Sequence, residues 1–461
     1  MDAGHVRDAA LLAGLEFDEA TELEVEGEDP ILPSPLRLGL GASTALALVG
    51  QEAAKLWQLR GGGRQRLRID ARHAAASLRS YLAIGFDGRR PSFPPRAGAS
   101  LTAIWPCRSD RYIHLHGSFR DAPRTLALLG LPSDADPEAV AAATAQWDAF
   151  ELEEELGRRG LCGAVCRTPA EWSAHPQGRA LASLPVVEIR RIGDAPPRPL
   201  PPADRPLEGV RVLDLTRVLA GPTCARTLAE HGATVLHVAA PNLPLVPLFE
   251  IDTGHGKRQT YLDVSRPDGA VRLRQLLRQA DVFSQGFRLG VMDRLGFGPE
   301  ELARACPGIV YVSINAYGHV GPWRGRPGWE QLAQAATGVT VLQAERTGAP
   351  SPMLAPAAMN DYTTGYFAAY GAILALRRRA TEGGSWLVTA SLAQTSMWYL
   401  RLGLLEGPLP EEAPSDTSGY LATRPSAWGK LTYLRPALQM SETPPRWELP
   451  PQPLGSGPAR W

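Results

Sequence analysis

Residues 207–241, LEGVRVLDLTRVLAGPTCARTLAEHGATVLHVAAP, decide the fold class of this chain. Residues 210–215 form a short apolar run, which is typical of a strand buried in a parallel sheet. The Gly-Pro pair at 221–222 marks a turn after that run. The residues after the pair carry the apolar stripe of a helix, which ends at Gly232. A second apolar run starts at Val235. The stretch therefore predicts the strand–helix–strand unit of an α/β protein.

The loop after the first predicted strand occupies the place where open α/β sheets bind ligands. The ligand of such a sheet lies beyond the carboxyl ends of the strands. Residues 217–223, which include Leu219 and Ala220, are therefore predicted at the mouth of a binding site. The turn has no G-x-G-x-x-G pattern, so it does not favour a dinucleotide.

Five further motifs follow this unit in a fixed order. They are GKRQTYLDV at 256–264, ADVFSQGFR at 280–288, LGFG at 295–298, PGIVYVSINAYG at 307–318 and NDYTTG at 360–365. With these motifs, residues 207–400 resemble the family III CoA-transferases, a group that also contains the α-methylacyl-CoA racemases. The resemblance implies a Rossmann-like parallel sheet that binds the nucleotide part of CoA, together with a smaller α/β domain.

The composition fits an enzyme without nucleic acid or a membrane as partner. The net charge is zero over 461 residues, and no stretch of the sequence reaches transmembrane length. The N-terminus is acidic where a signal peptide is basic, so we expect a cytoplasmic protein. Five cysteines argue against a disulfide framework, and Cys162 and Cys166 lack a second ligand pair, so we expect no metal. The acidic run at 151–155 is interpreted as a solvated helix face.

The order of the predicted domains is unusual. In the resembled family the smaller domain follows the nucleotide-binding half, whereas here the matching segment precedes it. A proline-rich linker separates the two parts. The predicted division is an N-terminal extension at 1–39, a degenerate or permuted smaller half at 40–193, the linker at 194–206, the CoA-binding catalytic domain at 207–400 and a proline-rich tail at 401–461.

An internal repeat supports the idea of two related halves. A shift of 320 positions sets the apolar helix pattern at 45–63 against that at 365–383, and each is followed by a strand pattern and another helix. In this register Gly41 falls opposite Asp361. The repeat predicts one working site in the chain, in the half that begins at Leu207.

Asp361 is the predicted catalytic residue. It precedes a long apolar helix and matches the catalytic aspartate of the resembled transferases. That aspartate attacks an acyl-CoA thioester and carries the CoA as an aspartyl thioester before an incoming acid takes it. The alternative interpretation is structural, because aspartate is also a favoured N-cap residue that accepts an amide hydrogen bond from Thr363 or Thr364.

The resemblance also implies contacts between basic residues and the nucleotide part of CoA. Lys257, Arg258 and Arg288 occupy the matching positions, and guanidinium and ammonium groups bind phosphate. CoA and acyl-CoA enter as substrates, and no permanently bound cofactor is expected. The chain departs from the family at Ala239-Ala240, where a charged residue often precedes the proline, which puts the adenosine contact in doubt.

The sequence leaves two other functions open. Racemisation needs a second acid–base group, and the segment that usually carries a histidine reads Trp329-Glu330 here, while His319 is assigned to a turn. A non-catalytic acyl-CoA-binding protein is the other alternative, because no loop that closes the site is recognisable. Ser313 and Ser391 have no visible His or Asp partner, so a hydrolase triad is not supported. We expect a homodimer, as in the resembled enzymes, or a monomer whose two halves mimic one.

Overall fold

A seven-stranded sheet forms the centre of the computed structural model, which describes residues 1–93, 100–118, 121–241, 243, 245–414 and 417–461. The strands, in spatial order, are β10 (Lys257–Tyr261), β9 (Thr234–Ala239), β8 (Arg211–Leu215), β11 (Val282–Gln285), β12 (Val310–Asn315), β13 (Ser385–Ser391) and β7 (Val187–Gly193). All neighbours are parallel except β13 and β7. The predicted α/β class with a mostly parallel sheet is confirmed.

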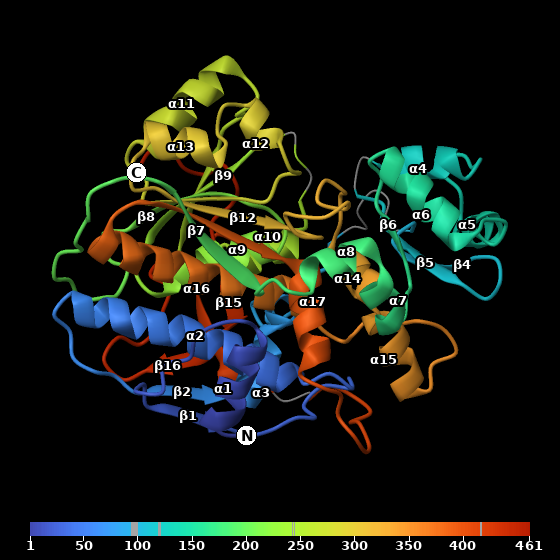
Figure 1. The fold of residues 1–461 in the computed structure, drawn as a ribbon, viewed down its shortest axis with the longest axis horizontal. Coiled ribbons are helices and arrows are strands. Elements are labelled where there is room, and N and C mark those ends of the chain that lie inside the picture. The colour runs from blue at the N-terminus through green and yellow to red at the C-terminus, as the bar shows by residue number, and fades with distance from the viewer. Residues whose placement is uncertain (94–99, 119–120, 242, 244, 415–416) are drawn as a thin grey trace.

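Helices cover both faces of this sheet, which explains its nearly continuous apolar strands (Figure 1). Leu213 and Leu215 of β8 pack with α11 (Pro267–Leu277), α12 (Val291–Arg294) and α13 (Pro299–Ala305). Val212, which points to the opposite face, belongs to the larger core with α9 (Ala220–Glu230) and α16 (Met359–Glu382). The strand–helix–strand unit predicted at 207–241 is therefore present as β8, α9 and β9.

The N-terminal part of the chain packs against the same core. Helix α2 (Leu38–Leu59) lies beside α16, with α1 (Ala3–Leu12) at its side (Figure 1). A small three-stranded sheet contains β1 (Leu23–Glu26) and β2 (Leu67–Asp70) from the N-terminal part and β16 (Leu438–Met440) from the C-terminal tail. The tail also forms the hairpin β14 (Leu421–Ser426) and β15 (Gly429–Leu434), which pairs with β3 (Gly85–Phe86).

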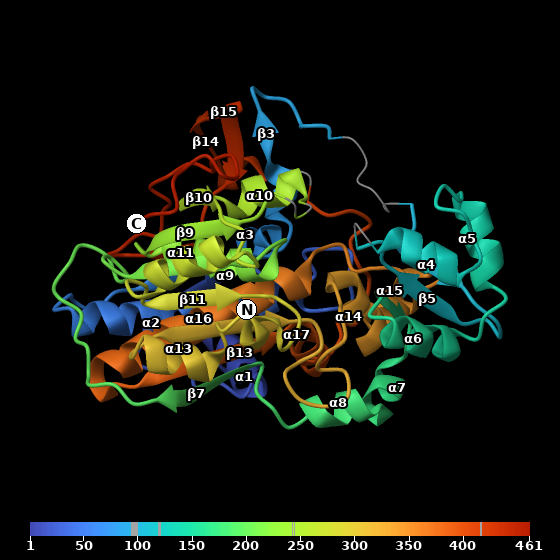
Figure 2. The same cartoon turned by 90° about the horizontal axis from the view of Figure 1, so that it is seen from above.

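Residues 100–181 lie to one side of the main sheet in both ribbon views (Figures 1 and 2). They form a three-stranded sheet with three helices and an apolar cluster of their own. The elements are β4 (Ala103–Pro106), β5 (Tyr112–Leu115), β6 (Gly163–Val165), α4 (Ala122–Leu128), α5 (Pro137–Thr144) and α6 (Ala149–Arg158). Helices α7 (Pro169–Ala174) and α8 (Pro176–Leu181) join them to α14 (Glu330–Thr337) and α15 (Val339–Thr347).

The order of elements follows the internal repeat. Helix α2 leads to β2 and α3 (Ala71–Ser77), as α16 leads to β13 and α17 (Leu392–Arg401). The short elements α10 (Pro247–Thr253), η1 (Ser80–Ala83) and η2 (Ser418–Tyr420) complete the assignment. The predicted helix–strand–helix order is present twice, while the duplication itself stays a prediction. Among the described residues, no helix combines the length and apolarity needed to cross a bilayer.

Candidate active site

A cavity of about 510 Å³ lies beyond the carboxyl ends of β8, β11 and β12. The loop between β8 and α9 lines one wall with residues 217–221, as the strand order predicts. Val218 adopts a φ of 71°, a left-handed conformation that is strained for a β-branched residue. A Cβ on Gly221 would lie 2.3 Å from that of Thr216, so only glycine fits this turn. Leu219 and Ala220 both face the cavity.

Asp361 lines the same cavity as the third residue of α16, with 7% of its surface exposed. The N-cap of this helix is Ala358, which makes no side-chain capping bond. The capping interpretation of Asp361 is therefore wrong. Instead, Glu330 at the start of α14 accepts hydrogen bonds from the amides of Asn360 at 3.2 Å and Asp361 at 2.7 Å.

The two carboxyl groups perturb each other. Burial raises the pKa of Glu330 to about 7, although hydrogen bonds from Gln334 and from the two helix amides act in the opposite direction. Burial also raises the pKa of Asp361 well above its ordinary value, and the charge of Glu330 raises it further. Because only Glu330 receives stabilising hydrogen bonds, it ionises more readily than Asp361. Two neighbouring carboxyls with raised pKa values are typical of a functional site.

The structure does not bring Lys257 to the cavity. Its ammonium is 1% exposed and lies 2.9 Å from Oδ2 of Asp214 and 2.9 Å from the carbonyl oxygen of Pro222. Lys257 thus ties β10 to β8 and α9, so its predicted contact with CoA phosphate is not supported by its position. Arg258 points to solvent from the edge strand β10 and does not line the cavity either.

Arg288 does line the cavity, about half exposed, with Nη2 3.5 Å from Oδ2 of Asp121. Two arginines that the sequence analysis did not single out, Arg217 and Arg326, line it as well. Arg217 belongs to the predicted loop, so its position was a usable signal. The cavity wall thus carries three guanidinium groups, the side chain best suited to phosphate and carboxylate.

Residues from the first half of the chain close the cavity. Ser118, Asp121 and Cys162 face it from the segment that follows α3. Trp329, next to Glu330, donates a hydrogen bond of 2.7 Å to the Ser118 hydroxyl and stacks on His116 with ring centres 4.6 Å apart. No local sequence pattern reveals these contacts, because they join residues more than 200 positions apart.

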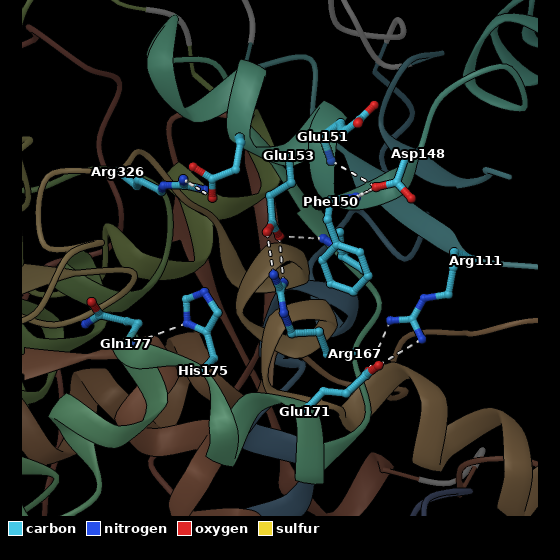
Figure 3. Close-up of polar contacts among 12 residues, drawn as sticks. Arg111, Asp148, Phe150, Glu151, Glu153, Arg167, Glu171, His175, Gln177 and Arg326 are labelled. Carbon is cyan, nitrogen blue, oxygen red and sulfur yellow. Dashed lines mark hydrogen bonds and ion pairs between the residues drawn. The ribbon is translucent and has the colours of Figure 1, made fainter. Parts of the chain in front are cut away.

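A buried ion pair lies within this segment, and a second ion pair joins it to the loop before α14 (Figure 3). Glu153 of α6 is 1% exposed and accepts hydrogen bonds from Arg167 at 2.7 Å and from the amide of Val165 at 2.8 Å. The prediction of a solvated acidic face is therefore wrong for Glu153. Next to it, Glu154 accepts a 2.6 Å hydrogen bond from Arg326. The Arg326–Glu154 contact holds α6 against the loop that carries Trp329 and Glu330.

Ser313 has a histidine partner that the sequence analysis missed. Its hydroxyl lies 2.9 Å from Nε2 of His319 and accepts a 2.8 Å hydrogen bond from Gln285. Burial lowers the pKa of His319 to about 4. No described carboxylate bonds His319, and neither Ser313 nor His319 lines the cavity, so the pair is not a hydrolase triad.

Known proteins are similar in sequence to this chain. Residues 207–427 match the profile of CoA-transferase family III. An acyl-CoA transferase of Gibberella moniliformis is 32% identical over 434 residues, which cover 86% of this chain and 75% of that protein. Acetyl-coenzyme A transferase nodX of Hypoxylon pulicicidum is 32% identical over 333 residues, or 66% of this chain and 56% of that protein.

A solved structure, that of a CAIB/BAIF family protein from Brucella suis, is 26% identical with a TM-score of 0.40, and the match covers 50% of this chain and 65% of that one. The matched region thus spans between about half and three quarters of the relatives' lengths. On the family profile and the extended match to the Gibberella protein, this chain belongs to CoA-transferase family III.

Proposed function

We propose that this chain transfers CoA from an acyl-CoA thioester to a carboxylic acid, with Asp361 as the covalent carrier. The observation that carries the proposal is the position of Asp361, a nearly buried carboxyl group that faces a cavity at the carboxyl ends of parallel strands. Membership of the family supports the reaction class.

The proposed steps balance without any other reactant. The Asp361 carboxylate attacks the thioester carbonyl, which forms an acyl–aspartyl anhydride and releases the CoA thiolate. The thiolate attacks the aspartyl carbonyl, so the first acid leaves and an aspartyl-CoA thioester remains. The acceptor carboxylate then forms a new anhydride with Asp361 and displaces the thiolate. Attack of the thiolate on the acceptor carbonyl gives the new acyl-CoA and restores Asp361.

Each tetrahedral intermediate needs hydrogen-bond donors for its oxyanion. The amides of Asn360 and Asp361 already donate to Glu330, so the start of α16 is not available for this task. We therefore assign the oxyanion contact to the loop at Leu219 and Ala220, whose residues face Asp361 across the cavity wall. An Ala220 amide at the first turn of α9 also gains from the positive end of that helix.

Arg288 is the proposed contact for a CoA phosphate. Its present partner Asp121 is 3.5 Å away, and the Arg288 side chain is about half exposed. Ion pairs of this kind contribute little free energy, so a phosphate can replace the carboxylate. Lys257 and Arg258 have no part in this proposal because neither lines the cavity.

Mass spectrometry of the protein after incubation with acetyl-CoA or succinyl-CoA tests the proposal. We expect a CoA or acyl adduct on the peptide that contains Asp361. Asp361→Asn should lose the adduct and reduce transfer to an acceptor acid roughly 10⁴-fold or more, while Asp268→Asn on the exposed start of α11 retains both. Acyl-CoA binding without an adduct or exchange would reject transfer and favour the non-catalytic alternative.

A further inference from the structure

A second and larger cavity, of about 1260 Å³, shares no lining residue with the cavity that Asp361 faces. It is formed by the loop at 28–32, the segment 72–90 and the tail residues 410–414 and 417–434. This volume exceeds the roughly 300–1,000 Å³ of most small-molecule sites. Nothing in the proposed reaction uses this cavity.

The contacts of Asp29, within the loop at 28–32, match those of Glu330. Asp29 accepts hydrogen bonds from the amides of Gly39 and Leu40, both at 2.9 Å. Gly39 and Leu40 are the second and third residues of α2, as Asn360 and Asp361 are of α16. In both halves a carboxylate from a preceding segment thus caps a long buried helix. Counted from these amides, Leu40 rather than Gly41 occupies the position of Asp361.

The two cavities are also built in the same manner. Residues next to Glu330 and the first residue of α17 line the active-site cavity, and it is closed by the segment that follows α3. Residues next to Asp29 and Arg72 near the start of α3 line the second cavity, and it is closed by the segment that follows α17. Each half therefore completes the cavity of the other. Among the residues that the structure describes, neither Leu40 nor any aspartate lines the second cavity, so it has no counterpart of Asp361 there.

The second cavity carries an excess of positive charge. Four arginines line it, together with two carboxylates, Glu28 and Glu412; the arginines are Arg72, Arg79, Arg89 and Arg90. Within the described residues, no carboxylate lies within 4 Å of any of these four guanidinium groups. Arg90 donates a hydrogen bond to the carbonyl oxygen of Leu82, at 3.1 Å. Burial and the charge of Arg90 lower the pKa of Arg79, as expected for a cation without a counterion.

We propose that this cavity is a second site, unable to react, that binds a phosphate-bearing ligand of the CoA type. Unpaired guanidinium groups bind phosphate oxygens in bidentate geometry. The apolar side chains of Ile31, Leu82 and Ile84 line the same cavity and suit the uncharged arm of such a ligand. The ligand class rests on the proposed function, whereas the position of the site does not.

Equilibrium dialysis with radiolabelled CoA at physiological salt tests this site. We expect two CoA molecules for each chain of the intact protein, and Arg79→Gln with Arg90→Gln should weaken one of them roughly tenfold or more. Arg72→Gln with Arg89→Gln, which changes two exposed side chains, should weaken the same site without any risk to the fold. Arg266→Gln with Arg278→Gln, on the distant helix α11, is the matched control and should keep both.

The outcomes separate this inference from the proposed function. One CoA per chain, unaffected by either arginine pair, overturns the second site even where Asp361 forms its adduct. An arginine-dependent CoA site without any adduct on Asp361 supports the second site and rejects the transfer reaction. Pantetheine, which has no phosphate, should not occupy the site, and equal binding of pantetheine would overturn the phosphate class.

Discussion

Glu330 connects the start of α16 to the reactivity of Asp361. It accepts hydrogen bonds from two buried amides of the first turn, so it stabilises the helix where an N-cap side chain is missing. Its negative charge also raises the pKa of Asp361, which disfavours the ionised form that attacks a thioester. One carboxyl group therefore fixes the position of the nucleophile and limits its reactivity at low pH.

Replacing Glu330 by glutamine should shift the pH dependence of transfer. Glutamine keeps one oxygen for the helix amides but carries no charge, so the pKa of Asp361 falls. The acidic limb of kcat/KM for acyl-CoA then moves to lower pH. Steady-state rates between pH 5 and 9 check this. A variant with lower activity but an unmoved limb would show that Glu330 acts only on the helix.

Glu230 should make the stability of the protein depend on pH. Burial raises the pKa of this carboxyl to about 8, against the partial compensation of Arg226 and Arg205. The pKa of Glu230 in the folded protein lies above the ordinary 4.5. The free energy of unfolding therefore falls as the pH rises from 4.5 to about 8, by at most about 1.4 kcal/mol per pH unit. Glu230→Gln should remove this slope.

Urea unfolding at pH 5, 6.5 and 8 measures the effect. The exposed Glu382→Gln at the end of α16 is the control and should retain the slope of the original protein. A slope that is identical in the Glu230 variant would mean that other groups take up the proton.

At the scale of elements, the Lys257 side chain joins β10, which carries it, to β8 and α9. Burial alone would raise the pKa of Asp214 on β8, but Lys257, His237 and the Thr216 hydroxyl lower it below its ordinary value. Lys257 on β10 also donates a hydrogen bond to the carbonyl oxygen of Pro222 in α9. The ion pair thus sits behind the cavity loop and joins the elements that position it.

Lys257→Met should destabilise the fold. It leaves the Asp214 carboxylate buried without its counterion, which costs roughly 3–5 kcal/mol. Lys257→Met with Asp214→Asn should recover part of that loss, because the unpaired charge is gone. Urea midpoints measure both. A variant of unchanged stability that binds CoA poorly would restore the original prediction of a phosphate contact.

Sequence patterns predicted those elements whose signal is local. Residues 210–215 became β8 and the stripe after Gly221 became α9, because a strand buried on both faces must be apolar and its helix must cover it. The carboxyl-end rule for parallel sheets predicted the loop at 217–223 at the cavity, whereas Asp361 was predicted from the family resemblance; both line the cavity. The partners of Glu330, Lys257 and Ser118 were not predictable, because hydrogen bonds between distant segments leave no periodicity in the sequence.

At the scale of the molecule, the two halves share one hydrophobic core. Leu46 and Val49 of α2 belong to the same apolar cluster as Phe367 and Leu374 of α16. The sequence repeat predicted a relation between these helices but not their contact. Nor did it predict that each half completes the cavity of the other, because that exchange depends on the paths of the segments that follow α3 and α17.

This arrangement favours the monomer over the homodimer, the two oligomeric states that the family resemblance leaves open. The apolar sides of α16 are covered within one chain by α2 and α9, and both cavities draw their walls from that chain. A second copy is needed neither to bury this helix nor to complete a site. We therefore expect a monomer of 49.6 kDa by sedimentation velocity and light scattering at micromolar concentration.

A fragment of residues 207–461 lacks α2, so we expect it to bind a hydrophobic dye and lose its near-ultraviolet circular dichroism. A stable dimer of the intact chain, or a fragment with native circular dichroism, would contradict the view that its first half replaces a partner subunit.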